Sequence, residues 1–267
     1  MSTNAAAFAA LHRPGHPLLL PNPWDIGSAK ILESLGFQAL ATTSSGYAAT
    51  LGRADGAVTR DEAIGHAAAV AAAVGVPVSA DLENCFADDP EGVAETVRLA
   101  KAAGLAGCSV EDATGRDQDP IYDPGLAAER VAAAVEAAGD GFVLTARAEN
   151  HLHGREDLDD TIARLLSFQE AGAHVLYAPG VTAADQVATV VAAVQRPVNV
   201  LALVGAPSVS ELAELGVARV SVGGAFAFAA YGALAEAGRE LLGGGTYGYL
   251  ARTRDGRAAA GEAFADH

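Results

Sequence analysis

The chain has 267 residues, with 17 Lys and Arg against 33 Asp and Glu, which gives a formal net charge of −16 at pH 7. Hydrophobic residues make up 51% of it, so the chain has ample material for the core of one large α/β domain or two small ones, and its composition excludes general disorder. The net charge argues against nucleic-acid binding, because it would repel a phosphate backbone.

Short apolar runs alternate with Ala-rich stretches through the first 240 residues, a pattern that predicts alternating strands and helices. The predicted strands are Pro17–Leu20, Ala39–Thr43, Val76–Ala80, Gly107–Val110, Phe142–Ala146, His174–Ala178, Val198–Ala202 and Arg219–Val222. The predicted helices are Ile26–Leu35, Arg60–Val74, Pro90–Ala103, Gly125–Ala138, Leu158–Ala171, Ala183–Ala193, Ser208–Leu215 and Ala225–Leu242.

This alternation predicts the fold class. Eight strand–helix units in about 250 residues are typical of a (β/α)8 barrel of the TIM type, and we predict that fold. A doubly wound open parallel sheet is the alternative. Against it, the first predicted strand is followed by Pro23-Trp24-Asp25 and not by the G-x-G-x-x-G turn of a dinucleotide-binding unit.

The sequence after Leu242 differs from the rest. Gly243-Gly244-Gly245 can end the last helix, and residues 246–267 are more polar. We therefore divide the chain into a catalytic barrel at 1–242 and a C-terminal arm at 243–267. The arm is either a frayed terminus or a segment that packs on another subunit, to which it would offer Tyr247, Tyr249, Leu250 and Phe264.

Cysteine usage and the absence of targeting signals bear on location. Cys85 and Cys108 are too few for a disulfide scaffold and fit a reducing compartment. Met1–Ala10 lacks the basic start and apolar run of a signal peptide. Ala63–Ala80 carries no formal charge, but Pro77 interrupts it, so it is a poor membrane span. We expect a cytoplasmic protein with no membrane contact.

Acidic side chains stand where predicted strands end. Asp81 and Glu83 follow the third strand two residues apart, so they point the same way, and Glu111 follows the fourth. Asp55 lies in the loop after the second strand. Converging carboxylates repel one another unless protons, an Arg or a cation neutralise them. The set favours a hard cation such as Mg²⁺, whereas each acid taken alone is equally typical of a helix cap or a solvated loop.

Two further features indicate an anionic ligand. Arg147 ends the fifth predicted strand, and its planar guanidinium can bind a carboxylate through two parallel hydrogen bonds. Its alternative role is an internal salt bridge to Glu149 or Glu111. The small, hydroxyl-rich loop Thr42–Gly46 can bind a carboxylate or phosphoryl oxygen through its N–H groups and hydroxyls, or form a plain turn.

Other residues give weaker signals. His151 and His153 lack a third ligand and predict an exposed loop. Cys85 follows the acidic pair, which would raise the pKa of its thiol, so we expect it to be inert. Gly223-Gly224 resembles a barrel phosphate site, on thin evidence. The sequence has no Ser-His-Asp triad motif, Walker loop or zinc spacing.

Several of these segments occur in an order that resembles the isocitrate lyase/phosphoenolpyruvate mutase superfamily. They are Leu20–Ala29 (Leu-Pro-Asn-Pro-Trp-Asp-Ile-Gly-Ser-Ala), Ala41–Gly46 (Ala-Thr-Thr-Ser-Ser-Gly), Leu51-Gly52 with Asp55, Asp81-Leu82-Glu83, Val110-Glu111-Asp112 and Ala146-Arg147. The resemblance spans residues 18–240. It implies a (β/α)8 barrel that holds Mg²⁺, with Mn²⁺ as a substitute, at its C-terminal rim, and a 2-oxo acid or its enolate as the reacting species.

The resemblance also implies roles for single residues. Asp81 resembles the carboxylate that contacts Mg²⁺ directly. The family's carboxylates that bind the waters of the Mg²⁺ ion correspond to Asp55, Glu83 and Glu111. Much of the family has Asp at the position of Glu83, and the longer Glu side chain alters the geometry of these waters. The family's catalytic and substrate-binding positions correspond to Arg147, Asp55, Glu111, Asp81, Thr43, Ser44 and Ser45. Family members form tetramers that exchange C-terminal helices, which implies a homo-oligomer.

Departures from the family pattern narrow the reaction. The stretch Asp112–Tyr122 lacks the Cys and Lys of the Lys-Lys-Cys-Gly gating loop of isocitrate and methylisocitrate lyases. Phosphoenolpyruvate mutase and phosphonopyruvate hydrolase use Lys, Asn or Thr in this loop, and here only Thr114 can be matched to them. After the sixth predicted strand, Ala178-Pro179 replaces a position that is polar in the family. The groups that stabilise an enolate are thus present, and those that deliver a proton are altered.

We therefore expect a Mg²⁺-dependent lyase that cleaves C–C bonds in small 2-oxo or 2-hydroxy acids, by decarboxylating an oxaloacetate-like acid or by cleaving an alkylmalate or methylisocitrate. Cleavage of a 2-hydroxy acid needs a base, for which Tyr47, Glu149 and Tyr122 are candidates. Phosphorus–carbon chemistry of the mutase or phosphonopyruvate hydrolase type is one alternative. A barrel that binds a 2-oxo acid without turnover is another.

Overall fold

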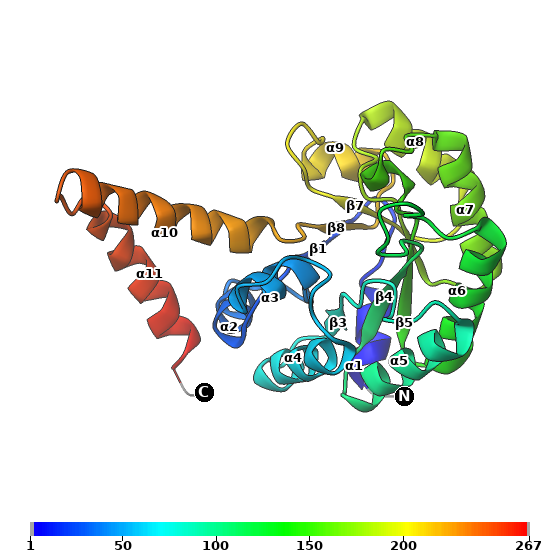
Figure 1. Ribbon diagram of the computed structural model, residues 1–267, viewed down its shortest axis with the longest axis horizontal. Helices are drawn as coiled ribbons and strands as arrows, with labels where there is room; N and C mark the ends of the chain where they lie inside the picture. Colours follow the sequence, from blue (N-terminus) through cyan, green and yellow to red (C-terminus); the bar gives the residue numbers. More distant parts are fainter. Residues whose placement is uncertain (1–2, 266–267) are drawn as a thin grey trace.

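Eight parallel strands follow one another around a nearly closed barrel in the computed structural model, which describes residues 3–265 (Figure 1). The strands are β1 (Leu18–Leu20), β2 (Leu40–Ala41), β3 (Val78–Ala80), β4 (Gly107–Glu111), β5 (Val143–Arg147), β6 (Val175–Tyr177), β7 (Val198–Leu201) and β8 (Arg219–Ser221). β8 pairs with β1, and a backbone hydrogen bond from Ala41 N to Pro21 O (3.1 Å) links the strand ends on either side of the remaining gap. The predicted (β/α)8 barrel is confirmed, and the open-sheet alternative is wrong.

Helices cover the outside of this barrel. They are α2 (Ile26–Ser34), α3 (Ser44–Thr50), α4 (Arg60–Ala73), α5 (Pro90–Ala102), α6 (Pro124–Ala138), α7 (Leu158–Glu170), α8 (Ala184–Ala193) and α9 (Val209–Glu214), with a 3-10 turn η1 (Asn150–His153) after β5. Side-chain caps explain several starts, because Asp25, Asp89 and Asp157 each accept from the third backbone N–H of the helix that follows. Thr59 and Ser208 begin α4 and α9 with reciprocal capping boxes.

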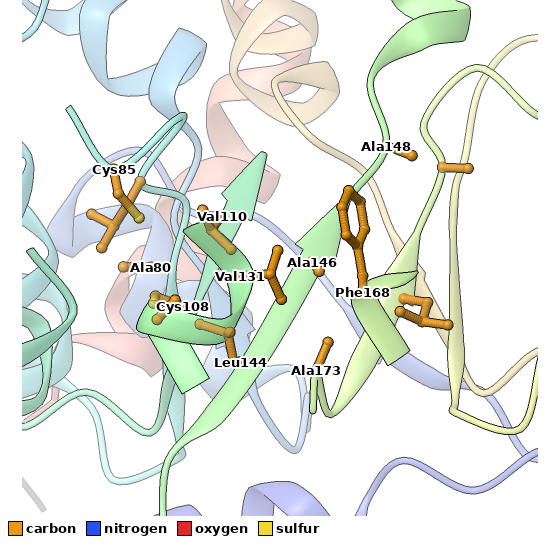
Figure 2. Close-up of a cluster of buried hydrophobic side chains, with 14 of the residues drawn as sticks. Ala80, Cys85, Cys108, Val110, Val131, Leu144, Ala146, Ala148, Phe168 and Ala173 are labelled. Atoms are coloured by element: carbon orange, nitrogen blue, oxygen red, sulfur yellow. The ribbon is translucent and has the colours of Figure 1, made fainter. Parts of the chain in front are cut away.

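Apolar side chains that point outward from the strands form the larger part of the core. Figure 2 shows Val110 of β4 and Leu144 and Ala146 of β5 lying against Val131 and Phe168, which come from α6 and α7. These residues are fully or almost fully buried. Because side chains alternate along a strand, the residues between them, such as Ser109, Thr145 and Arg147, point into the barrel.

A short N-terminal helix closes the lower end of the barrel. α1 (Thr3–Ala10) was not predicted, and its Ala5 and Phe8 pack with Leu18, Val143 and Val175, which begin or lie near the start of their strands. Phe8 is 0% exposed. α1 therefore fills the barrel at the end opposite the carboxyl ends of the strands.

The last two helices depart from the barrel. α10 (Ala225–Gly243) projects away from it, and α11 (Leu250–Ala263) folds back toward α2 (Figure 1). Ala227 is the one fully buried residue of α10, whereas Leu234 and Leu242 are 68% and 90% exposed. None of the helices described between residues 3 and 265 is both long and apolar enough to cross a membrane.

Truncation of the helix that closes the barrel tests its contribution to stability. We expect Phe8→Ala to lower the free energy of unfolding by about 3–5 kcal/mol, because it leaves a cavity in a closed interior. Leu152→Ala, at a site 49% exposed, is the control and should change it by less than about 0.5 kcal/mol. Urea titration measures both, and equal small effects would show that α1 does not seal the barrel.

Candidate functional site

The carboxyl ends of the strands surround a cavity of about 190 Å³. Active sites of this barrel type lie at this end. Six of the residues predicted for the site line the cavity, namely Thr43, Ser44, Ser45, Asp55, Asp81 and Arg147. Glu111 does not line the cavity itself but forms an ion pair with Arg147, which does. Glu83 lines a much smaller void on the other side of Asp81. The strand ends therefore bring the predicted residues to one region.

Arg147 lies at the centre of this region and binds three carboxylates. Its Nη1 is 2.9 Å from Asp81 Oδ1, its Nη2 is 3.1 Å from Glu111 Oε2, and its Nε is 2.7 Å from Glu149 Oε1. Burial disfavours the charge, but Glu149, Glu111 and Asp81 together hold the pKa of Arg147 well above its ordinary value. We call these four residues the Arg147 cluster. The internal salt bridges to Glu149 and Glu111, which were the alternative role for Arg147, are both present.

Asp81 is held by groups from two neighbouring strands, since Thr42 and Ser44 follow β2 and Ser109 belongs to β4. Ser44 N donates to Asp81 Oδ2 at 3.1 Å, Ser109 Oγ donates to Asp81 Oδ1 at 3.3 Å, and Asp81 N donates to Thr42 Oγ1 at 2.9 Å. Together with Arg147 these contacts leave the Asp81 carboxylate in one orientation. Such rigidity suits a ligand that must present a defined oxygen.

The predicted Thr42–Gly46 loop is the start of a helix. Thr43 caps α3, with its Oγ1 accepting from Gly46 N at 3.3 Å. A Cβ at Gly46 would lie 2.5 Å from Thr43 Cγ2 and 3.1 Å from Trp24 Cβ, so only glycine fits there. The N–H groups at the start of α3 thus point toward Asp81 and the cavity, which is a favourable place for negative charge.

Two further carboxylates lie near the Arg147 cluster without a cationic partner among the described residues: Asp55 lines the cavity, and Glu83 lines the smaller void beside Asp81. Burial, then repulsion by Asp81 and Asp55, raises the pKa of Glu83 to about 7. Burial also raises the pKa of Asp55, and Asp81 adds to this. Glu83, Cys85 and Phe86 are the described non-glycine residues with positive φ, at 51°, 58° and 56°. Backbone strain of this kind concentrates at functional sites.

The charge of this region fits a hard cation. Among residues 3–265, no three Asp, Glu, His or Cys side chains are close enough together to hold a metal ion directly, because Arg147 lies between the acids. One directly bound carboxylate is sufficient for an ion that keeps most of its waters, as Mg²⁺ does. Arg147 is shared by Asp81, Glu111 and Glu149, and Asp55 lies nearby without an ion pair, so this side of the cavity carries more acidic than basic groups, and their oxygen atoms are the donors such an ion prefers.

A second arginine lies deeper in the cavity, and sequence reasoning missed it. Arg219 is 4% exposed and lines the cavity from β8. Its Nε donates to Asn199 Oδ1 at 2.9 Å, and its Nη1 donates to His12 Nε2 at 3.2 Å. The one sequence signal was a charged residue at an inward position of an apolar strand.

His12 acts as a neutral acceptor for Arg219. Its Nδ1 lies 2.9 Å from Phe8 O and so carries the proton, which leaves Nε2 free to accept. Burial, then the charge of Arg219, lowers the pKa of His12 to about 3. The helix that closes the barrel is thereby connected to the cavity.

With this geometry in place, comparison with known proteins identifies the family. The model of the phosphoenolpyruvate phosphomutase family matches residues 8–242. The chain belongs to this family. The predicted resemblance to the isocitrate lyase/phosphoenolpyruvate mutase superfamily is confirmed.

Similar proteins agree with this membership. A crystal structure of a lyase/mutase-type protein from Burkholderia cenocepacia is 56% identical, with a TM-score of 0.90 over 92% of this chain and 90% of that one. An uncharacterized protein of Mycobacterium tuberculosis is 35% identical over 89% of this chain and 90% of its own length. Oxaloacetate decarboxylase of Bradyrhizobium sp. is 32% identical over 74% and 70%. The structure of 2,3-dimethylmalate lyase is 27% identical, with a TM-score of 0.83 over 93% and 90%.

The loop that departs from the family pattern is held closely against the barrel. Tyr122 OH donates to Asp88, Arg116 Nη1 lies 2.9 Å from Asp88 Oδ1, and the Arg130 guanidinium stacks 4.0 Å from the Tyr122 ring centre. Tyr122 is therefore occupied away from the cavity. Tyr47, another candidate base, stacks on the ring of His66 at 3.8 Å.

Glu149 and Cys85, the remaining candidates near the acids, are both buried. Glu149 binds Arg147 with its carboxylate, and its backbone N–H donates to Asp112 Oδ1 at 2.8 Å. Burial raises the pKa of the Cys85 thiol to about 12, with smaller contributions from Glu111 and Asp81. The expectation of an inert thiol therefore agrees with the structure, although burial outweighs the acids as its cause. His151 and His153 lie on η1.

The neutral state of His12 predicts a pH dependence of stability. Below pH 6.5, His12 becomes protonated in the unfolded chain, whereas in the folded chain it stays neutral until about pH 3. Protonation therefore stabilises the unfolded chain, and the free energy of unfolding falls as the pH falls. His12→Gln keeps an acceptor for Arg219 and cannot titrate. We expect the wild-type curve to be steeper than the variant curve between pH 6 and 4, by up to about 1.4 kcal/mol per pH unit, in urea titrations. Parallel curves would show that His12 titrates normally.

Proposed function

We propose that this family member is a Mg²⁺-dependent lyase that cleaves C–C bonds in small 2-oxo or 2-hydroxy carboxylic acids, with Mn²⁺ as a substitute metal. The observation that carries the proposal is the Arg147 cluster beside the N-terminus of α3, in a cavity of about 190 Å³. That volume suits an acid of a few carbon atoms. Relatives named oxaloacetate decarboxylase and 2,3-dimethylmalate lyase support it.

The chain would hold the acid at two points. The N–H groups and hydroxyls of Thr43, Ser44 and Ser45 face the cavity and suit the carboxylate of the substrate. Arg147 offers a guanidinium to the same space, and a substrate carboxylate would take the place of one of its three acidic partners. The substrate would then lie with its keto group toward Asp81.

Asp81 would hold Mg²⁺ directly, and Asp55, Glu83 and Glu111 would hold its waters. When bound, the ion supplies a Lewis acid that favours negative charge on the keto oxygen. Breaking the C–C bond one carbon away from the keto carbon leaves enolate charge on that oxygen. The N–H groups of α3 and the guanidinium of Arg147 add fixed positive potential around the developing charge, which lowers the barrier more than it tightens substrate binding.

Decarboxylation suits the residues present better than retro-aldol cleavage. The first reaction needs electron withdrawal and a proton from solvent. The second needs a base at the hydroxyl, but Tyr122 and Tyr47 are engaged elsewhere and Glu149 is buried against Arg147. An oxaloacetate-like acid is therefore our first choice of substrate. Because the matched family is that of phosphoenolpyruvate phosphomutase, phosphorus–carbon chemistry is the competing assignment, and binding without turnover is the third.

A substrate panel tests the proposal. Pyruvate release is followed from oxaloacetate, alkylmalates and phosphonopyruvate, and phosphoenolpyruvate formation is followed from phosphonopyruvate, with Mg²⁺ and with EDTA, after subtraction of the enzyme-free rate. We expect Mg²⁺-dependent release from oxaloacetate or an alkylmalate, and a fall in kcat of about 100-fold or more in Asp81→Asn. Asp159→Asn, on the exposed side of α7, is the matched control and should retain full activity.

The outcomes of the panel are distinct. Turnover of phosphonopyruvate alone would replace our proposal by phosphorus–carbon chemistry. Binding without turnover of any compound would leave a 2-oxo acid-binding barrel. Full activity of Asp81→Asn would contradict the metal assignment even if a C–C bond is cleaved.

We also propose that the C-terminal arm (residues 243–267), which contains α11, packs on a second copy of the chain together with the preceding helix α10. Exposed apolar side chains of this size, such as Leu234 and Leu241, are typical of a surface covered in an assembly. Light scattering after size exclusion should give a dimer or tetramer for the wild type and a smaller species for Leu234→Asp/Leu241→Asp. A wild-type monomer would contradict the proposal.

A further inference from the structure

Charge is distributed unevenly across the cavity. On one side the single charge of Arg147 faces Asp81, Glu111 and Glu149, and Asp55 lies nearby. Negative charge therefore exceeds positive charge on this side before a cation is bound. A substrate with two carboxylates would be disfavoured here unless a further positive group acts on it.

Arg219 supplies a positive group on the floor of the cavity. Arg219 lies two residues before Ser221 on β8, so both side chains point into the barrel. Two residues correspond to about 7 Å along the strand, so Arg219 lies that much farther from the open end of the cavity. Among residues 3–265 no carboxylate lies within 4 Å of its guanidinium nitrogens, and the structure gives it no ion pair. A buried charge without a counter-charge is costly, so it is an uncommon feature in a protein interior.

The partners of Arg219 orient the guanidinium and leave its charge intact. Asn199 accepts from Nε at 2.9 Å, neutral His12 accepts from Nη1 at 3.2 Å, and Asn199 Nδ2 donates to Ser221 Oγ at 3.0 Å. All of these partners are neutral. A carboxylate at either acceptor position would have satisfied the same hydrogen bond and cancelled the charge.

The cavity also contains an unsatisfied polar atom. Thr145 lines the same cavity as Arg219, is 1% exposed, and its Oγ1 has no hydrogen-bond partner among the described residues. Buried polar atoms of this kind are normally satisfied, so one that borders a cavity points to a polar ligand or water there. Positive charge and an open hydroxyl in one cavity are complementary to an anion.

We propose that Arg219 is a specificity-determining residue that makes the cavity prefer dicarboxylic acids over acids with one carboxylate. It rests on the proposed function and deepens it, because it names dicarboxylic 2-oxo acids as the substrate class. The Arg147 side holds the carboxylate next to the keto group, and the uncancelled charge of Arg219 favours the second carboxylate within the same small space. His12 and Asn199 are positioning residues for this guanidinium.

A purely structural role for Arg219 predicts different behaviour. Arg219 joins β7, β8 and the segment after α1, so its removal could simply loosen the barrel. Asn199→Asp separates the two roles. It keeps an acceptor for Arg219 Nε and adds a buried ion pair. The bond to Ser221 would reverse, because the carboxylate accepts from the Ser221 hydroxyl where Asn199 Nδ2 donated to it. The structural tie to Arg219 would therefore be kept while its positive charge would be cancelled.

The test compares two unreactive ligands of nearly equal shape. Malonate carries two carboxylates, and malonamate replaces one of them by a neutral amide. Calorimetric titration of the full chain in the presence of Mg²⁺ gives the ratio of their dissociation constants. We expect wild type to prefer malonate, and Asn199→Asp and Arg219→Gln each to reduce that preference on the order of 10- to 100-fold. Arg98→Gln, which removes an exposed guanidinium on α5, should leave the ratio unchanged.

Each outcome supports or overturns the proposal. If Arg219 had only a structural role, its loss would weaken the binding of both ligands alike and leave the ratio of their dissociation constants unchanged. An unchanged ratio therefore overturns the proposal. Absence of any wild-type preference for malonate overturns it as well. Should Arg219→Gln fail to fold, Asn199→Asp alone decides. If the chain turns over no 2-oxo acid but its preference for malonate depends on Arg219, the result contradicts the proposed lyase function and supports this inference. If the chain turns over a 2-oxo acid but the substitutions leave the ratio unaltered, the lyase function is supported and this inference is overturned.

Discussion

The ion pairs of Arg147 are the constraint on which the rest of the site depends. Buried carboxylates repel one another, and Asp81, Glu111 and Glu149 lie together because they share one guanidinium. The β4–β5 register sets Glu111 directly beside Arg147, so the cluster follows from strand pairing and not from a mobile loop. Asp55 and Glu83 lie near this cluster without an ion pair to it, and the raised pKa of each carboxyl reflects burial and the neighbouring acids; a bound cation would relieve this repulsion.

The two ends of the barrel interior are coupled through a chain of polar contacts. Phe8 seals the lower end, His12 accepts from Arg219, and Arg219 borders the cavity. The orientation of the Arg219 guanidinium at the cavity is therefore set in part from the lower end of the barrel. At the upper end, the alternation of side chains leaves polar groups from several strands facing a common space.

Much of the fold and part of the site could be predicted from the sequence, because both depend on local periodicity. Apolar runs between helical segments located all eight strands, and their carboxyl ends identified Asp81 and Arg147 as site candidates. α1 was missed because an Ala-rich segment has little apolar periodicity, and α3 because Ser-Ser-Gly is typical of a turn until Thr43 caps a helix. The hydrogen bond between His12 and Arg219 spans 207 positions, which no spacing rule detects.

The central claim is that the acids around Arg147 hold one divalent cation. Calorimetric titration of the metal-free chain with Mg²⁺ tests it without reference to any substrate. We expect one site per chain, lost in Asp81→Asn and kept in the surface variant Asp159→Asn. Equal Mg²⁺ binding by Asp81→Asn and wild type, or no binding by wild type, would contradict the claim.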